Sequence, residues 1–185
     1  MDGFLLLLLA ISLSMDAFAV AVCGGMGLAE VTRKKAMGVR FGLWFGSFQA
    51  LMPIVGYYAA FYFRSYIENY DHWVAFVLLC YLGIGMLRPK AEGCPVVTGY
   101  TNKKMCMLAI ATSIDALAIG ISLALLGTTI FMPALVIGLV TFALSYLGCL
   151  FGTKIGALGQ RKAECAGGFI LICIGCKVLF EHLMG

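Results

Sequence analysis

Six long apolar runs, separated by short polar stretches, dominate the pattern of hydrophobic and polar positions along the chain. About 20 apolar residues span a bilayer as a helix, and backbone groups inside lipid must be paired within that helix. The pattern therefore predicts an all-α integral membrane protein with six transmembrane helices. The expected helices cover residues 3–24, 37–63, 72–87, 105–126, 131–152 and 163–183.

The composition agrees with this prediction. Of the 185 residues, 62% are hydrophobic and only 12% are charged, and the mean hydropathy is +1.00. Soluble domains are about half apolar and about a quarter charged. The net charge is +4, but the basic residues lie in short loops rather than along one folded face. We therefore expect the lipid bilayer as the surroundings and no nucleic-acid partner.

The two halves of the chain repeat. Residues 14–20, Ser-Met-Asp-Ala-Phe-Ala-Val, match residues 113–119, Ser-Ile-Asp-Ala-Leu-Ala-Ile, and Pro and Gly residues mark the stretch between the halves as a linker. Because each half holds three expected spans, the second half must enter the membrane from the opposite side. Inverted repeats are a transporter design with the substrate site near the midplane. The expected single membrane domain, residues 1–185, comprises two inverted three-helix repeats and a cytoplasmic linker, at residues 1–88, 104–185 and 89–103.

The basic residues are distributed unequally over the two sides of the membrane. With six spans, all of the 13 Lys and Arg residues except Arg64 and Lys177 fall on one side. Basic residues accumulate in cytoplasmic loops. We therefore expect both termini outside the cytoplasm and the central linker inside it. The residues on the cytoplasmic side are Arg33, Lys34, Lys35, Arg40, Arg88, Lys90, Lys103, Lys104, Lys154, Arg161 and Lys162.

One aspartate lies near the middle of the first helix of each repeat, Asp16 in one and Asp115 in the other. An ionised carboxylate at that depth costs at least ~2.5–3.5 kcal/mol, and matching positions of inverted repeats should converge. Two carboxylates suit a divalent cation, and oxygen ligands favour Mg, Ca or Mn. Without the cation they repel, so we expect proton uptake and hence metal–proton exchange. In the alternative interpretation, the two acids share one proton and only hold two helices together.

Other oxygens near the middle of the spans are candidates to complete a metal site. Ser12 lies four residues before one aspartate and Thr112 lies three residues before the other, so each shares a helix face with its acid. Gln49, Thr141 and Ser145, on the second and fifth helices, either bind metal or form hydrogen bonds between helices. The candidate metal ligands are Asp16, Asp115, Ser12, Thr112, Gln49 and Ser145.

Two further hydroxyls belong to the repeated motif itself. Ser14 and Ser113 precede the aspartates by two residues, about 200° away on an unbroken helix. They can join the site only if the helix unwinds locally, as in some transporters. Otherwise each hydroxyl is expected to bond its own backbone.

The paired aspartate motifs resemble those of the bacterial manganese efflux pump (MntP) family. The resemblance covers nearly the whole chain. It implies an exporter of Mn²⁺ in the bacterial inner membrane that is no enzyme, with no cofactor and with Asp16 and Asp115 as essential acids. Some relatives carry a glutamate at the position of Gln49. The resembling stretches are residues 14–19, 48–56, 72–79, 111–118 and 167–172.

Two other functions compete with metal export. Six-helix inverted-repeat proteins also carry electrons through thiols, and this chain has Cys23, Cys106 and a C-x-x-C at residues 173–176. Unlike the aspartates, these cysteines do not occupy matching positions of the repeats. An exporter of amino acids or similar organic cations on a related fold would use the aspartates to hold an amino group. Replacement of all eight cysteines tests the first alternative, and titration of metal into Asp16→Asn tests the second.

Overall fold

The computed structural model describes residues 3–26, 28, 30–67, 77, 80, 84 and 100–184. These residues are almost entirely helical and contain no strand, so the all-α expectation is confirmed for this part of the chain. The expected third helix (72–87) and linker (89–103) lie mostly outside the described residues. The helices are α1 (Gly3–Leu13), α2 (Met15–Met26), α3 (Val31–Ile67), α5 (Asn102–Thr112), α6 (Ile114–Leu125) and α7 (Phe131–Met184).

The first and fourth expected helices are each broken near the middle. α1 and α2 meet at Ser14 with a bend of 43°, and α5 and α6 meet at Ser113 with a bend of 40°. The expectation of one continuous helix over residues 3–24, and of another over 105–126, is therefore wrong. Ser and Asp side chains permit such a break, because they can hydrogen-bond the backbone and compete with the helical ladder.

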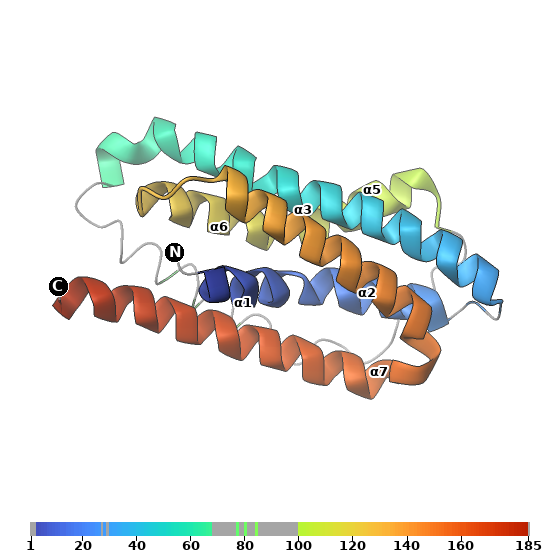
Figure 1. Ribbon diagram of the computed structural model, residues 1–185. Coiled ribbons are helices and arrows are strands. Elements are labelled where there is room, and N and C mark those ends of the chain that lie inside the picture. The colour runs from blue at the N-terminus through green and yellow to red at the C-terminus, as the bar shows by residue number, and fades with distance from the viewer. Residues whose placement is uncertain are drawn as a thin grey trace.

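The longest helix, α7, contains 54 residues and folds back on itself, so that its orange and red arms run in opposite directions (Figure 1). The apolar pattern predicts two helices here, at residues 131–152 and 163–183, and the structure joins them in one helical run. The chain still reverses its direction between the two arms (Figure 1), so the polar stretch between the two expected helices turns the chain although its residues are helical.

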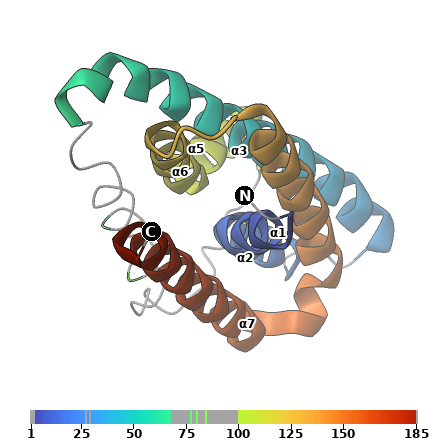
Figure 2. The same cartoon turned by 60° about the vertical axis from the view of Figure 1, so that its left-hand side comes forward.

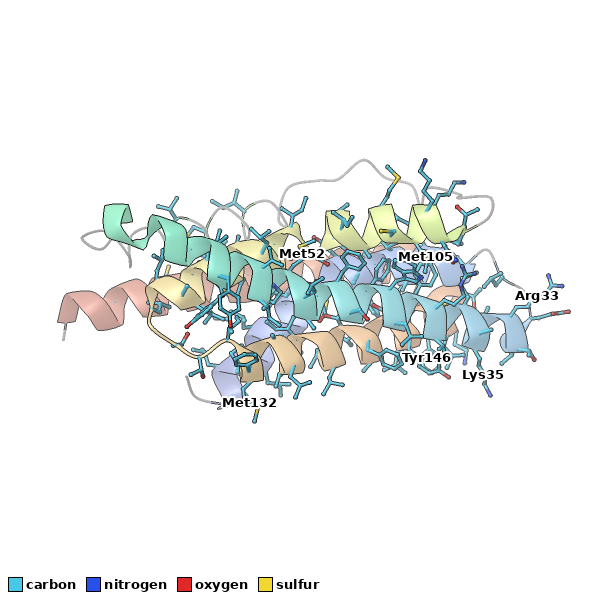
Figure 3. All side chains as sticks on the ribbon, turned by 90° about the horizontal axis from the view of Figure 1, so that it is seen from above. Arg33, Lys35, Met52, Met105, Met132 and Tyr146 are labelled. Carbon is cyan, nitrogen blue, oxygen red and sulfur yellow. The ribbon has the colours of Figure 1, made fainter. Side chains whose placement is uncertain are left out.

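Membrane-crossing segments can be identified among the described residues by length and hydropathy. The segment Phe131–Lys154 is long and apolar enough to cross a bilayer, and each bent pair would be one further span. α3 has 37 residues and is therefore about 55 Å long. Arg33 and Lys35 lie at one end of this bundle and Met132 at the other (Figure 3).

Glycines let helices from the two halves touch backbone to backbone. α3 packs on α6, and α2 packs on the first arm of α7 (Figure 2). A Cβ on Gly120 of α6 would overlap the Pro53 carbonyl of α3, and one on Gly25 of α2 would overlap the Cys149 carbonyl of α7. Small residues permit this close approach inside a membrane. Each contact joins a helix of the first half to a helix of the second half.

These contacts recur with the two halves exchanged. Gly56 of α3 packs on the Leu117 carbonyl of α6, and Gly148 of α7 packs on the Phe18 carbonyl of α2. Leu117 follows Phe18 by the same 99 residues that separate the two aspartates. The two glycines therefore receive matching residues of the repeated motif.

A second repeated pattern, which the sequence analysis missed, supplies these glycines. Its first members, Gly46 and Gly138, pack on each other, since a Cβ on Gly46 would lie 2.9 Å from the Gly138 carbonyl oxygen and a Cβ on Gly138 3.0 Å from that of Gly46. The spacing is the same in both copies, which consist of Gly46, Gln49, Pro53 and Gly56 and of Gly138, Thr141, Ser145 and Gly148.

Two clusters of apolar side chains fill the space between the helices. We call them the Leu13 cluster and the Phe41 cluster after one buried member of each. The Leu13 cluster comprises Leu9, Ala10, Leu13, Ala116, Ile119, Leu123, Ile130, Ala134, Ile137 and Ile174. The Phe41 cluster comprises Ala17, Ala21, Phe41, Phe45, Met105, Ala109 and Cys149.

Candidate functional site

Buried polar side chains lie between the Leu13 cluster and the Phe41 cluster. Along α3, Gln49 separates Phe45 of the Phe41 cluster from Met52, which packs on the Leu13 cluster. The same order holds along α5–α6 and along the first arm of α7, where one cluster ends before the polar residues and the other begins after them. Met52 and Met105 accordingly lie at different positions along the bundle (Figure 3). The polar layer consists of Ser12, Ser14, Gln49, Thr112, Ser113, Thr141 and Ser145, all buried.

The break between α1 and α2 is held by Ser14. Its hydroxyl donates to the Ala10 carbonyl at 2.6 Å and lies 2.8 Å from the hydroxyl of Thr141 on α7. A serine hydroxyl has one proton. Because that proton goes to Ala10, Thr141 is the donor in the hydroxyl pair. The break is therefore tied to a helix of the other half.

Two side chains replace the backbone hydrogen-bond partners that are lost at the break between α5 and α6. In an unbroken helix the Ala116 N–H would donate to the Thr112 carbonyl. Here the Ala116 N–H donates to Asp115 Oδ1 at 2.8 Å. The Thr112 carbonyl instead accepts from Gln49 Nε2 at 3.3 Å. Asp115 and Gln49 thus take the places of the two missing backbone partners.

Gln49 connects the two breaks. Its amide nitrogen also donates to the Leu13 carbonyl at 3.0 Å, so one atom bonds the last carbonyl of α1 and the last carbonyl of α5. These carbonyl oxygens can be no farther apart than the sum of the two hydrogen-bond lengths. Asp16 and Asp115 each lie three residues beyond the bonded carbonyl. The structure therefore places the two helix breaks close together, and with them the starts of the two half-helices that carry the acids.

Both aspartates are partly buried and lie in the first turn of a helix, Asp16 in α2 and Asp115 in α6. A helix N-terminus carries a partial positive charge that stabilises an anionic side chain. The described residues contain no group of three or more His, Cys, Asp or Glu placed to hold a metal ion. A cation bound here would therefore need neutral oxygens in addition to these two carboxylates.

Two buried neutral oxygens lack a hydrogen-bond partner within the described residues, Gln49 Oε1 and Ser145 Oγ. Both side chains are fully buried in the polar layer. A buried polar atom without a partner costs about 1–3 kcal/mol, so such atoms often mark a place for an ion or water. Gln49 and Ser145 are the two candidate ligands with this property.

The other candidate hydroxyls bond their own backbone. Ser12 donates to the Leu8 carbonyl at 2.9 Å, and Thr112 donates to the Leu108 carbonyl at 3.0 Å. Ser113 likewise donates to the Ala109 carbonyl at 2.7 Å. Their protons are thus engaged, and metal ligation by Ser12 and Thr112 stays a prediction. The helices unwind locally at Ser14 and Ser113, which was the condition for these hydroxyls to join the metal site. Both hydroxyls nevertheless donate to backbone carbonyls of their own helix.

Arg40 of α3 and the residues that lead into α5 cover the Phe41 cluster at one end. The Tyr100 ring packs edge-on against Phe41 with the ring centroids 5.0 Å apart. Arg40 donates to the Tyr100 carbonyl at 3.2 Å and to Asn102 Oδ1 at 2.9 Å. Burial, with a smaller contribution from Cys149, raises the pKa of the Tyr100 hydroxyl above its ordinary value. The hydroxyl therefore stays protonated, and Tyr100 covers the cluster as an uncharged side chain.

The cysteines are in different states. Cys23 takes part in a disulfide. Cys149 is fully buried in the Phe41 cluster with its thiol free, where it packs as a small hydrophobic residue. Cys106, Cys173 and Cys176 are also free thiols.

Comparison with known proteins gives one consistent result. A family model described as "Putative manganese efflux pump" matches residues 30–179. Relatives named "Putative manganese efflux pump MntP" include one from Acetivibrio thermocellus, 44% identical over 99% of this chain and 93% of its own length. Another, from Desulfitobacterium hafniense, is 44% identical over 99% of this chain and 97% of its own. The relative from Syntrophotalea carbinolica is 42% identical over the whole of both chains. No solved structure matches the chain.

Proposed function

Because the chain belongs to the manganese efflux pump family, we propose that it is a secondary transporter that exports Mn²⁺ across the bacterial cytoplasmic membrane. The chain is a membrane protein and its relatives are named for manganese efflux. The observation that carries the proposal is the bridge from Gln49 to the Leu13 and Thr112 carbonyls. It joins two broken helices whose second halves each carry a partly buried acid in the first turn. Broken helices of this kind form substrate sites in transporters.

The proposed architecture has six transmembrane helices in two inverted repeats. The exchanged glycine contacts support it, because Gly56 meets Leu117 as Gly148 meets Phe18. The mutual contact of Gly46 and Gly138 would then lie on the pseudo-two-fold axis. In this arrangement the linker faces the cytoplasm and both termini lie outside it, as the distribution of Lys and Arg predicts.

We assign the Mn²⁺ ligands to the polar layer. Asp16 and Asp115 would supply the negative charge, and Gln49 Oε1 and Ser145 Oγ the neutral oxygens, because these two atoms have no other partner among the described residues. Ser12 and Thr112 would complete the shell through lone pairs, since their protons are already donated. Oxygen ligands suit Mn²⁺ as well as Mg²⁺ and Ca²⁺, so the choice of manganese rests on the family.

The two apolar clusters would close the site from both sides. The Phe41 cluster lies toward the end that carries Arg33 and Lys35, and the Leu13 cluster lies toward the end that carries Met132 (Figure 3). The described members of both clusters are apolar side chains and the Cys149 thiol. Transport in this proposal requires each cluster to open in turn.

The test of export is the manganese content of cells. A strain without its own manganese exporter, loaded with Mn²⁺, is expected to accumulate several-fold less manganese when it carries this gene than when it carries an empty vector. Elemental analysis of washed cells measures the difference, with iron and magnesium content measured in the same samples. Equal manganese content in the two strains, with the protein present in the membrane, would overturn the proposed function.

Proton exchange is a separate prediction. Loss of Mn²⁺ leaves two carboxylates that repel each other, which favours the uptake of protons from the side on which the metal is released. Purified protein in liposomes that contain a pH-sensitive dye should therefore move protons opposite to Mn²⁺, only when a Mn²⁺ gradient is applied. Liposomes without protein give the baseline. Transport of Mn²⁺ without any change in internal pH would contradict the exchange while leaving export intact.

A further inference from the structure

We propose that Gln49 is a positioning residue that clamps the two helix breaks together while the site holds no metal. The clamp is the pair of hydrogen bonds from Nε2 to the Leu13 and Thr112 carbonyls, at 3.0 Å and 3.3 Å. Its existence depends only on these contacts, whereas its part in transport rests on the proposed function. The role differs from metal ligation, because it uses the amide nitrogen rather than the amide oxygen.

The chemistry of the surroundings decides which end of the amide faces the breaks. Leu13 and Thr112 present carbonyl oxygens, which only accept hydrogen bonds, so the amide group must present its two N–H donors to them. Turning the amide over would place Oε1 against two other oxygens and leave three buried acceptors without a donor. Gln49 Oε1 therefore points away from both carbonyls, and within the described residues it has no partner.

The clamp holds groups that have no other way to be satisfied in an apolar interior. Each carbonyl lies at the end of a half-helix, where the next turn no longer supplies an N–H donor. Gln49 itself is fully buried, so water does not substitute freely for its N–H groups. Separation of the breaks must therefore break at least one of the two hydrogen bonds and leave a carbonyl without a donor, unless water or a cation takes the place of the amide.

The amide N–H₂ group occupies a position suited to a cation. It carries partial positive charge and sits between two half-helix carbonyls, which in transporters coordinate ions. The same side chain could then turn Oε1 toward an arriving metal and free the carbonyls. Gln49 would thereby link occupation of the site to release of the breaks.

The clamp is connected to both apolar clusters. Leu13 is itself a member of the Leu13 cluster, and Thr112 lies one helical turn after Ala109 of the Phe41 cluster. α3 also places Phe45 one turn before Gln49 in the Phe41 cluster. Loss of the clamp should therefore loosen the packing of both clusters, not of one alone.

Thiol labelling in the absence of metal tests this directly. Cys149 is a native, fully buried probe in the Phe41 cluster, and Ala10→Cys places a matching probe in the Leu13 cluster. Each is used alone, in full-length protein whose other cysteines are replaced by serine, with a metal chelator present. The labelling rate by a small maleimide is compared for wild-type Gln49, Gln49→Met, Gln49→Glu and Gln49→Lys. Gel filtration selects folded protein.

Loss of the donors should raise the labelling rate at both probes by about tenfold or more. This holds for Gln49→Met, which has no polar group, and for Gln49→Glu, whose carboxylate cannot donate. Gln49→Lys restores donors without an oxygen ligand, so it should label as slowly as wild type while Mn²⁺ binding is lost by titration calorimetry. Rates equal to wild type in the Met and Glu variants, or fast labelling of the Lys variant, would overturn the clamp.

Ser145→Ala is the matched control. It removes the other buried oxygen without a partner but no donor to a carbonyl, so labelling should stay slow while Mn²⁺ binding weakens. A rise as large as that of Gln49→Met would show that any polar loss in this layer loosens the clusters, which contradicts a specific role for Gln49. Since no metal is present during labelling, failure of manganese export leaves this result unaffected.

Discussion

Manganese export should fall by about 100-fold or more when either of the two partly buried aspartates is changed to asparagine. Asp16→Asn or Asp115→Asn removes one of the two negative charges that would hold the divalent cation, and no other acid of the described residues is clustered with them. Asparagine keeps the size of aspartate and one oxygen, so in Asp115→Asn the amide oxygen can still accept from the Ala116 N–H. The defect should therefore lie in Mn²⁺ binding and not in folding. Titration calorimetry and Mn²⁺ flux into everted vesicles measure it.

Glu30→Gln provides the control with the same acid-to-amide change. Glu30 is exposed and pairs with Arg33 at 3.0 Å on the surface, where such pairs contribute about 0–1 kcal/mol. Its variant should transport at the wild-type rate. Wild-type Mn²⁺ transport by the Asp16→Asn and Asp115→Asn variants as well would remove the carboxylates from the mechanism and assign metal binding to other groups.

The second large effect is expected at the contact between α3 and α6. Gly120→Ala places a methyl group on the Pro53 carbonyl oxygen, and because that atom is backbone, it cannot move aside as a flexible side chain would. α3 and α6 must separate along their length, at a cost of about 3 kcal/mol or more. A fluorescence-monitored melt in detergent should show a large loss of thermal stability. Gly25→Ala, which meets the Cys149 carbonyl, should behave alike.

Gly3→Ala is the corresponding control, since a Cβ at Gly3 has nothing within 4 Å. The same chemical change there should leave the melting temperature unchanged or slightly higher, because Ala has the greater helix propensity. A melting temperature of Gly120→Ala within a degree or two of this control would mean that the two helices do not approach as closely as described.

Part of the site could be predicted from local chemistry. Asp16 and Asp115 are conspicuous because a charge in the middle of an apolar run is costly wherever the rest of the chain lies. Gln49 and Ser145 could be named as candidates because a polar group in the middle of an apolar run is also costly. The sequence does not show, however, whether the amide of Gln49 presents its oxygen or its nitrogen to the site. That choice depends on Leu13 and Thr112, which are far from Gln49 along the chain.

The second repeat was within reach of sequence reasoning. Gly46, Gln49, Pro53 and Gly56 have the same spacing as Gly138, Thr141, Ser145 and Gly148. The offset of these copies is 92 residues rather than the 99 of the aspartate motifs, because the loops before them differ in length. A search for repeats that uses a single offset over the whole chain therefore does not detect the second repeat.

By itself, the sequence determined which segments are helical and apolar, where acids enter them, and which loops are basic, because hydropathy and the cost of a charge in lipid are properties of single segments. Only the tertiary structure decided that two of those helices break at Ser14 and Ser113, and that Gln49 bridges the breaks. A backbone carbonyl can leave its helical partner only when another donor replaces it. For Leu13 and Thr112 that donor comes from a different helix, α3, so the packing of the helices decides it.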